Sequence, residues 1–458
     1  TESVLARLHY VVHVAPGATV PEVDHAVLEE RLARATQSWE DLFTEATVAA
    51  LGEAQAPAFL AEYATAFPEG YKEEFRASVA VNDALTIDRL QPSELALDWY
   101  AHEGDDTDRM RFKVIRVGSA MSLSRILPTL QVMGVEVLDE HPHVIARSTG
   151  APAWVLDFGL RLPPGDIEER DSLPSRATDA FRATWFGECE TDAFNALVVR
   201  AGLTWRQTSL IRAYSRYLRQ VGFSFGQEYI QRVMTGDAGI VRLLVRLFET
   251  QFDPRRYPED DARLEASADL VAQIERELEG VLSLDHDRIF RAFLAAIRAT
   301  LRTNYFAQDR GPRQAFAFKI DPRAIPDMPL PKPMFEIWAY SPRVEGVHMR
   351  FGTVARGGLR WSDRSEDFRT EVLGLVKAQE VKNAVIVPVG AKGGFFAREL
   401  PDPAVDREAW FTEGKASYRE FVSALLDVTD NRLSGGIVAP RGVVRRDGDD
   451  SYLVVAAD

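Results

Sequence analysis

Apolar and polar residues follow a strand–helix–strand order in the stretch 106–165. The segment 110–117 (MRFKVIRV) alternates apolar and polar residues, as a half-buried strand does. In 122–134, apolar residues recur at helical spacing. Two β-rich segments follow, at 135–148 and at 153–162, and we interpret the first as a pair of strands joined by a His-Pro-His turn. The pattern predicts a small α+β unit.

The regions on either side of this unit are mainly helical. Residues 1–105 open with a β-rich segment at 4–14, which we expect to be a strand, and continue with an Ala-rich helical pattern. The stretch 163–175 is rich in Pro, Asp and Glu, which indicates a linker. In 176–310, apolar residues recur every three or four positions, which predicts a helical module.

The last region, 311–458, has the pattern of a mixed α/β domain. Its β-rich segments alternate with helical ones after a Pro-rich stretch. We expect strands at 315–320, 334–341, 347–355, 384–389 and 451–458, and helices that end near Asn383 and Thr429. The chain as a whole is therefore predicted to be multidomain, with α+β and α/β parts.

Composition narrows the class of protein. A length of 458 residues implies several domains, and 46% hydrophobic with 27% charged residues is typical of a globular chain. The formal net charge of −15 argues against nucleic acid or an anionic membrane as a partner. No apolar run approaches the roughly 20 residues that span a bilayer, and no signal peptide is recognisable. We therefore expect a cytoplasmic protein.

The single cysteine and the spacing of other ligand-type residues argue against further classes. Cys189 is the only cysteine in the sequence, so an intrachain disulfide and a thiolate metal cluster are both excluded. No spacing of His, Asp and Glu indicates a metal site. The chain begins at Thr1 without Met and ends within a β-rich segment, and we expect it to be part of a longer protein.

Lysines gather in one glycine-rich stretch, 354–396. Only eight of the 54 basic residues are lysine, and three of the eight fall between residues 377 and 392. Lysine, unlike arginine, can lose its proton when burial or neighbouring cations lower its pKa. A chance cluster on a solvated helix face is the alternative interpretation. The glycine-rich turns on both sides favour a functional site.

Familiar phosphate- and nucleotide-binding motifs do not fit this stretch. GAKGG at 390–394 lacks the Gly-x4-Gly-Lys-Ser/Thr pattern of a phosphate loop, and no Gly-x-Gly-x-x-Gly fingerprint or Gly-x-Ser-x-Gly elbow occurs. Glycine-rich backbone instead accompanies four cations: Arg356, Lys377, Lys382 and Lys392. Such a group suits a small anion with two carboxylates. Asp458, at the end of a predicted strand, could complete an acid–base pair with one lysine.

The order of these motifs resembles that of glutamate dehydrogenases. That family has Lys-Gly-Gly-Leu/Ile-Arg, a helix with Gln-x-x-Lys near its end, an apolar strand, and Pro-x-Gly-Gly-x-Lys-Gly-Gly. Here the corresponding segments are RGGLR at 356–360, QEVK at 379–382 and PVGAKGG at 388–394. The amino-acid sequence of this stretch is most similar to that of the large multidomain NAD-dependent glutamate dehydrogenases of bacteria. Those proteins carry ACT-like regulatory units and helical modules ahead of the catalytic domain.

The resemblance implies two catalytic residues. Lys392 matches the lysine that polarises the 2-oxo group and activates water in the oxidative direction. Asp458, in an Ala-Ala-Asp ending, resembles the aspartate that shuttles protons to and from the amino nitrogen.

The resemblance also implies the substrate-binding residues. Arg356, followed by Gly357, occupies the place of a lysine that meets the side-chain carboxylate. Lys382 and Gln379 match residues that hold the α-carboxylate. Because the interval from Lys382 to the catalytic lysine is shorter than in small glutamate dehydrogenases, Lys377 is an alternative ligand for the α-carboxylate.

The resemblance then implies a division of the chain into modules. An ACT-like end and a helical segment occupy 1–105, an ACT-like α+β unit 106–165, a helical module 176–310, and the glutamate-binding part of the catalytic domain 311–458. No residue of this chain is assigned to cofactor binding, because the NAD-binding domain is expected beyond Asp458. The chain alone is therefore expected to be inactive.

The implied function is NAD-dependent oxidative deamination of L-glutamate to 2-oxoglutarate and ammonia. The expected partners are an amino-acid effector at the ACT-like units and further copies of the chain in a homo-oligomer. Two alternatives remain open at this point. One is a dehydrogenase of another amino acid, and the other is a non-catalytic regulatory protein that senses amino acids.

Overall fold

The computed structural model divides the chain into two compact units. It describes residues 24–35, 37–92, 94–101, 106–165, 170–307, 311, 314–354, 356–383, 390–453 and 455. The first unit comprises Thr1–Ala96, Ile115–Ser119 and Pro142–Val155, and the second comprises Leu97–Val114, Ala120–His141 and Leu156–Asp458. The strand expected at 4–14 lies outside the described residues.

Helices make up most of the described part of the first unit. They are α1 (His25–Ala35), α2 (Trp39–Leu51), α3 (Ala56–Tyr63), α4 (Glu69–Glu74) and α5 (Ala77–Arg89). A capping box starts α2: the Ser38 side chain accepts from the backbone N–H of Asp41, whose carboxylate accepts from the backbone N–H of Ser38. The core of these helices is largely aromatic, because Phe43, Tyr63 and Tyr71 are all fully buried.

A four-stranded sheet follows along the chain. Its strands are β1 (Ala96–Tyr100), β2 (Arg109–Val117), β3 (Glu136–Ile145) and β4 (Ala153–Arg161), in the order β1-β2-β4-β3, and α6 (Leu123–Val132) connects β2 to β3. The predicted strand–helix–strand order is confirmed. The predicted His-Pro-His turn is wrong, because one strand runs through those residues. Pro142 is tolerated since β3 is an edge strand, where a missing N–H costs no ladder bond.

A helical module precedes the last region. It consists of α7 (Leu173–Trp185), α8 (Leu197–Arg200), α9 (Trp205–Gln220), α10 (Gln227–Gly236), α11 (Ala238–Phe252), α12 (Asp260–Glu279) and α13 (Leu284–Ala299). The helical pattern predicted from residue 176 onward is confirmed as far as Ala299. The prediction is wrong at its end, because Thr300–Thr303 forms β5 and pairs with the next strand of a sheet.

Six strands form the sheet of the last region, in the order β5-β6-β7-β8-β10-β9. They are β5 (Thr300–Thr303), β6 (Phe316–Ile320), β7 (Phe335–Tyr340), β8 (Val344–Arg350), β9 (Leu359–Trp361) and β10 (Ala391–Ala397). All neighbours pair antiparallel except β10 and β9, which are parallel. The β-rich segments that the sequence predicted at 315–320, 334–341 and 347–355 correspond to β6, β7 and part of β8.

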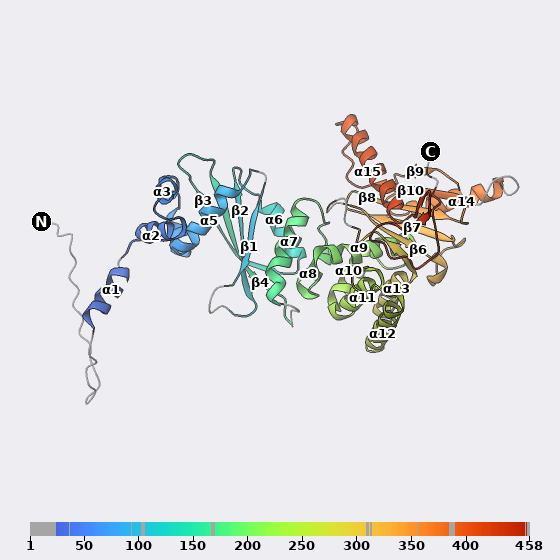
Figure 1. The fold of residues 1–458 in the computed structure, drawn as a ribbon, viewed down its shortest axis with the longest axis horizontal. Helices are drawn as coiled ribbons and strands as arrows, with labels where there is room; N and C mark the ends of the chain where they lie inside the picture. The colour runs from blue at the N-terminus through green and yellow to red at the C-terminus, as the bar shows by residue number, and fades with distance from the viewer. Residues whose placement is uncertain are drawn as a thin grey trace, which may run out of the picture. The chain divides into compact units, whose positions relative to one another are not determined.

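Apolar side chains cover this sheet on both faces. Phe318, Trp338 and Met349 belong to one core together with residues of α9, α11 and α13. Ala317 and Ile337, which alternate with them along the strands, belong to a second core with residues of α15 (Arg407–Asp427). The sheet therefore lies between the helical module and α15 (Figure 1).

Three remaining segments complete the description of the last region. Helix α14 covers Phe368–Asn383 among the described residues, where the sequence predicted a helix, and β11 (Asn431–Leu433) and β12 (Gly436–Val438) form a hairpin. The strand expected at 384–389 lies outside the described residues. The strand expected at 451–458 is wrong where it can be assessed, since residues 451–453 and 455 are not in a strand. Among the described helices, none is both long and apolar enough to cross a bilayer.

Candidate active site

The two glycine-rich turns of the stretch 354–396 lie side by side. Strands β9 and β10 run parallel, with Gly393 opposite Leu359, and an isolated parallel bridge joins Arg356 to Gly390. The backbone N–H of Ala391 donates to the carbonyl oxygen of Arg356 at 3.1 Å, and that of Gly393 donates to the carbonyl oxygen of Gly358 at 3.2 Å. The turn that carries Arg356 and the strand that carries Lys392 are therefore held together by backbone hydrogen bonds.

Glycine is required in these turns because backbone and side chains approach very closely. A Cβ atom on Gly357 would lie 1.4 Å from the carbonyl oxygen of Ala391. On Gly393 it would lie 2.4 Å from Leu359 Cδ2, and on Gly394 2.6 Å from Val372 Cγ2 of α14. Real Cβ contacts essentially never fall below 3.0 Å. No other residue type therefore permits this packing of the two turns and α14 without displacement.

Lys392 lies on the face of the sheet that packs against the helical module. It is half-buried on β10 and stands opposite Met349 of β8, whose side chain belongs to that core. Phe396, two pleats further along β10, packs against the same core. The lysine is thus fixed in direction by the register of β10 against β8.

Arg356 lies at the surface, at the start of the first turn. Its Nε donates to the hydroxyl oxygen of Tyr452 at 3.3 Å, and this hydrogen bond raises the pKa of the Arg356 guanidinium. The other arginine of the turn has a different role. Arg360 Nε lies 2.5 Å from Glu371 Oε1 on α14, and Glu371 also accepts a hydrogen bond from the Ser362 hydroxyl at 2.6 Å.

Helix α14 carries the remaining predicted cations. Lys377 is exposed on this helix. Gln379 and Lys382 lie in its last turns, but their side chains are outside the described part of the chain, as is Asp458. Among the predicted site residues, the structure therefore brings together the backbones of Arg356, Gly357 and Lys392. The positions of the other side chains stay predictions.

A buried ion pair sets the position of α14. Arg369, in its first turn, donates from Nε and Nη2 to the two carboxylate oxygens of Glu336 on β7, each at 2.7 Å. Burial lowers the pKa of Arg369, but the Glu336 carboxylate more than offsets this effect and raises it. The Gln220 side chain at the end of α9 also accepts from the backbone N–H of Arg369 at 3.1 Å and donates to the carbonyl oxygen of Ser365 at 2.8 Å. Helix α14 is thus attached to both the sheet and the helical module.

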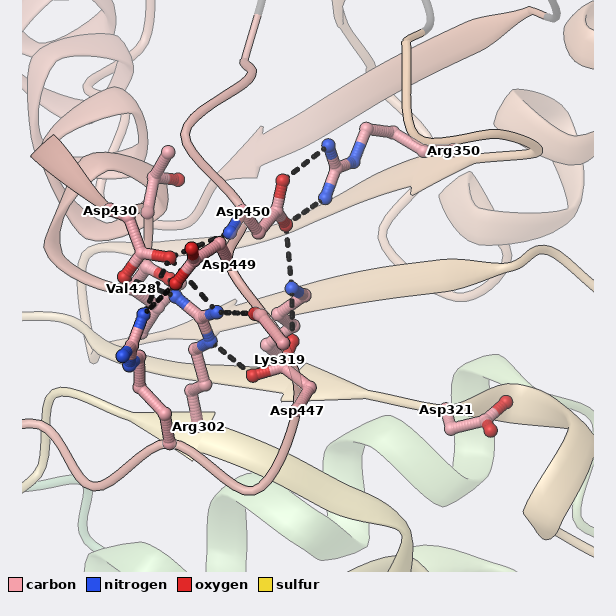
Figure 2. Close-up of polar contacts among 12 residues, drawn as sticks. Arg302, Lys319, Asp321, Arg350, Val428, Asp430, Asp447, Asp449 and Asp450 are labelled. Atoms are coloured by element: carbon pink, nitrogen blue, oxygen red, sulfur yellow. Dashed lines mark hydrogen bonds and ion pairs between the residues drawn. The ribbon is translucent and has the colours of Figure 1, made fainter. Parts of the chain in front are cut away.

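A second group of buried charges fixes the chain that follows α15. Figure 2 shows Arg302 of β5, Lys319 of β6 and Arg350 of β8 pointing toward carboxylates of the segment 430–450. The buried carboxylates are Asp430, Asp447 and Asp450. Arg302 Nη1 lies 2.9 Å from Asp430 Oδ1, and Lys319 Nζ lies 2.5 Å from carboxylate oxygens of both Asp447 and Asp450.

The buried ion cluster is balanced in charge. Three cations, Arg302, Lys319 and Arg350, face three aspartates, and Arg445 with Asp449 adds one pair at the rim. Burial raises the pKa of Asp450, but Arg350 and Lys319 lower it further, to about 2. The carboxylate is therefore ionised at neutral pH. Because every charge is matched within the protein, the cluster serves as an anchor of the segment rather than as an anion site.

The anchored segment leads back to the first glycine-rich turn. Arg350 Nη1 donates to Asp450 Oδ1 at 3.0 Å and to the carbonyl oxygen of Tyr452 at 2.7 Å. The Tyr452 hydroxyl then accepts the hydrogen bond from Arg356. Leu453 and Val455 pack against the core under α15. Residues 447–453 and 455 therefore lie over the sheet end that carries the two turns.

Sequence reasoning missed Tyr452 and the buried ion cluster. One signal was present: Lys319 is one of only eight lysines and interrupts the apolar strand FAFKI. The acidic run DGDD at 447–450 was a second signal, but nothing in the sequence links it to a strand more than 100 positions earlier. Among the described residues, no three His, Cys, Asp or Glu side chains form a group that could hold a metal ion.

Family comparisons cover most of the chain. Residues 273–458 match the bacterial NAD-glutamate dehydrogenase catalytic domain. Upstream, residues 189–254 match glutamate dehydrogenase helical motif 3 and residues 46–90 match helical motif 2. Residues 94–173 match the ACT3 domain, and residues 1–40 match the ACT2 domain.

Curated relatives are similar over the whole chain. The NAD-specific glutamate dehydrogenases of Mycobacterium tuberculosis and Pseudomonas aeruginosa are each 44% identical to it over its full length, and that of Halomonas elongata is 42% identical. The chain spans 28–29% of the length of these relatives. The chain therefore belongs to the family of bacterial NAD-glutamate dehydrogenases, and it carries ACT, helical-motif and catalytic-domain modules of that family.

Proposed function

We propose that this chain supplies the glutamate-binding half of an active site for the NAD-dependent oxidative deamination of L-glutamate to 2-oxoglutarate and ammonia. The observation that carries the proposal is the parallel pairing of the two glycine-rich turns, which joins the Arg356 turn to the Lys392 strand. The match to the catalytic domain over 273–458 supports the same reaction class. The division into modules given above is part of the proposal.

In the proposed site, the two carboxylates of glutamate are bound by cationic side chains of the chain. Arg356 binds the side-chain carboxylate, because a guanidinium presents paired donors to a carboxylate. Lys382, with Gln379, binds the α-carboxylate, and Lys377 is the alternative. Between these ends, the Lys392 ammonium stabilises negative charge on the oxygen bound to Cα as the 2-oxo group forms or reacts.

Proton transfer completes the role of this chain. Lys392 also activates the water that attacks the imino carbon, and Asp458 receives and returns the proton of the amino nitrogen. NAD, when bound, supplies the acceptor for the hydride that leaves Cα. No Gly-x-Gly-x-x-Gly fingerprint occurs in this sequence, so its residues do not fit a dinucleotide fold. We assign NAD binding to a part of the enzyme that lies outside this sequence, as part of the proposal.

The substrate class follows from Arg356. An arginine that meets a side-chain carboxylate favours glutamate over leucine or phenylalanine, which leave the cation unpaired. Replacing Arg356 by Gln should raise KM for glutamate by about 10- to 100-fold, since hydrogen bonds to charged groups contribute about 1.5–3 kcal/mol. The test is NADH formation by the full-length enzyme with each of the three amino acids. Faster turnover of leucine or phenylalanine than of glutamate would contradict the proposal.

Regulation and assembly are further parts of the proposal. The ACT matches support an amino-acid effector at those domains, and we propose a homo-oligomeric protein of the cytoplasm. Equilibrium binding of free amino acids to the full-length enzyme and its sedimentation behaviour would test the first two points. Absence of any amino-acid binding outside the catalytic site would refute the proposed effector.

A further inference from the structure

We propose that Tyr452 is a positioning residue for Arg356, and that the buried pair of Arg350 and Asp450 holds Tyr452 in place for this purpose. The inference rests on the proposed role of Arg356 in binding the substrate's side-chain carboxylate. Tyr452 and the aspartates of the buried ion cluster lie far from both glycine-rich motifs in the sequence.

The first step is the anchoring of Asp450. Lys319 and Arg350 are both buried, and both contact the Asp450 carboxylate. Figure 2 shows Asp450 between these two cations, with Asp447 bridging Lys319 to Arg302. A carboxylate held by two buried cations on neighbouring parts of a sheet has little freedom to move.

The second step extends the anchor from Asp450 to Tyr452. One nitrogen of Arg350, Nη1, donates both to the Asp450 carboxylate and to the carbonyl oxygen of Tyr452. The segment is therefore held at two points two residues apart, the side chain of Asp450 and the backbone of Tyr452. Both contacts are made by Arg350 of β8, and β8 pairs with β10, the strand that carries Lys392. The position of Tyr452 is thus fixed against the same sheet that carries Lys392.

The third step is the contact with Arg356. The backbone of Arg356 is fixed by its bridge to β10, but its long side chain lies at the surface, where many rotamers are open to it. The hydrogen bond from Nε to the Tyr452 hydroxyl restricts these rotamers. It occupies one of the five donors of the guanidinium, whereas a bidentate carboxylate needs two. The tyrosine can therefore orient the guanidinium without replacing the substrate.

The hydroxyl of Tyr452 can be separated experimentally from the anchor. The anchor uses the backbone carbonyl of Tyr452 and the Asp450 carboxylate, and neither depends on the phenolic oxygen. Tyr452→Phe therefore removes the contact with Arg356 and keeps the ring and the buried ion cluster. A residue that only stabilised the fold would change the melting temperature and not selectively the KM for glutamate.

The test is a double-mutant cycle in the full-length enzyme, with KM for glutamate, kcat and melting temperature as readouts. Tyr452→Phe should raise KM by about 10-fold, the lower end of the range for a hydrogen bond to a charged group, and leave kcat and the melting temperature unchanged. In an Arg356→Gln background the same change should have no further effect on KM. Equal effects of Tyr452→Phe in both backgrounds would overturn the inference, as would a KM identical to that of the wild type.

Two further variants test the anchor itself. Asp450→Asn should raise KM at least as much as Tyr452→Phe and lower the melting temperature, because it removes a charge from the cluster. Asp449→Asn is the matched control: its carboxylate is 58% exposed and pairs with Arg445, so KM should stay at the wild-type value. An Asp450→Asn enzyme that folds with unchanged KM would refute the anchor. Wild-type enzyme without glutamate-dependent NADH formation would instead refute the proposed function.

Discussion

Gly357→Ala is the substitution with the most clearly defined structural consequence. A Cβ atom at this position would lie 1.4 Å from the carbonyl oxygen of Ala391, whereas Cβ atoms keep at least 3.0 Å from such atoms. The two turns would have to separate by roughly 1.6 Å, the difference between these distances. Gly357 does not have a positive φ, so glycine is necessary here because of the close approach of the Ala391 backbone and not because of the backbone angle.

The expected effect on activity follows from that displacement. Misplacing a reacting group by about 1 Å can cost about 100-fold in rate, so kcat/KM for glutamate should fall by at least about 100-fold, or about 2.7 kcal/mol. Overpacking of this kind also lowers the free energy of unfolding by about 1–3 kcal/mol. Steady-state NADH formation and thermal unfolding of the full-length enzyme measure the two effects separately.

Gly374→Ala provides the matched control. Gly374 lies on the exposed side of α14, and a Cβ atom there would meet no atom within 4 Å. Alanine favours a helix over glycine by about 1 kcal/mol, so this variant should keep its activity and melt at the same or a higher temperature. If Gly357→Ala retained kcat/KM within about threefold of the wild type, the close pairing of the turns would not be required for catalysis, and the reasoning would be refuted.

Two further predictions concern buried titratable side chains near the site. Glu336→Gln should lower the free energy of unfolding by about 3–5 kcal/mol in urea denaturation, because it leaves the buried Arg369 without its carboxylate. Asp367→Asn removes a half-exposed carboxylate that pairs with the equally accessible Arg364, so it should cost less than about 1 kcal/mol, and equal effects of the two variants would contradict the prediction. Burial lowers the pKa of His348 from 6.5 to about 3, and neither of its ring nitrogens has a hydrogen-bond partner among the described residues. The unfolded chain therefore binds a proton below about pH 6.5 that the folded protein does not, so stability falls by up to about 1.4 kcal/mol per pH unit as the pH falls from 6.5 toward 3. His348→Gln should reduce this acid sensitivity in unfolding measured at neutral and mildly acidic pH, and identical pH profiles would count against it.

Local patterns predicted much of the fold because they reflect burial on one face of an element. The alternation in FAFKI and FEIWAY matches strands with one face on the helical module and the other on α15. The glycine-rich turns around 357 and 393–394 were predicted to belong to a functional site, and the structure shows which atoms approach one another closely there. A helix was predicted up to about Asn383, and α14 covers Phe368–Asn383 among the described residues.

Contacts between distant segments explain what the sequence did not predict. Residues 451–453 have strand-like composition, but the Arg350 side chain donates a hydrogen bond to the carbonyl oxygen of Tyr452, which a neighbouring strand would otherwise provide. The buried ion cluster joins strands β5, β6 and β8 to aspartates that follow α15, and no local period records such a pairing. Arg360 belongs to the RGGLR motif, yet its side chain pairs with Glu371 of α14, a contact that the motif does not indicate.

The most direct test of the central claim is the turnover of Lys392→Ala beside that of Lys415→Ala in the full-length enzyme. Lys415 lies on α15, with its ammonium over the Phe411 ring, and has no role in the proposed site. Loss of a proton-transferring, charge-stabilising lysine should reduce kcat for glutamate oxidation by at least about 1000-fold, whereas Lys415→Ala should leave it unchanged. Near-normal kcat in Lys392→Ala would contradict the assignment of the two glycine-rich turns as the glutamate site.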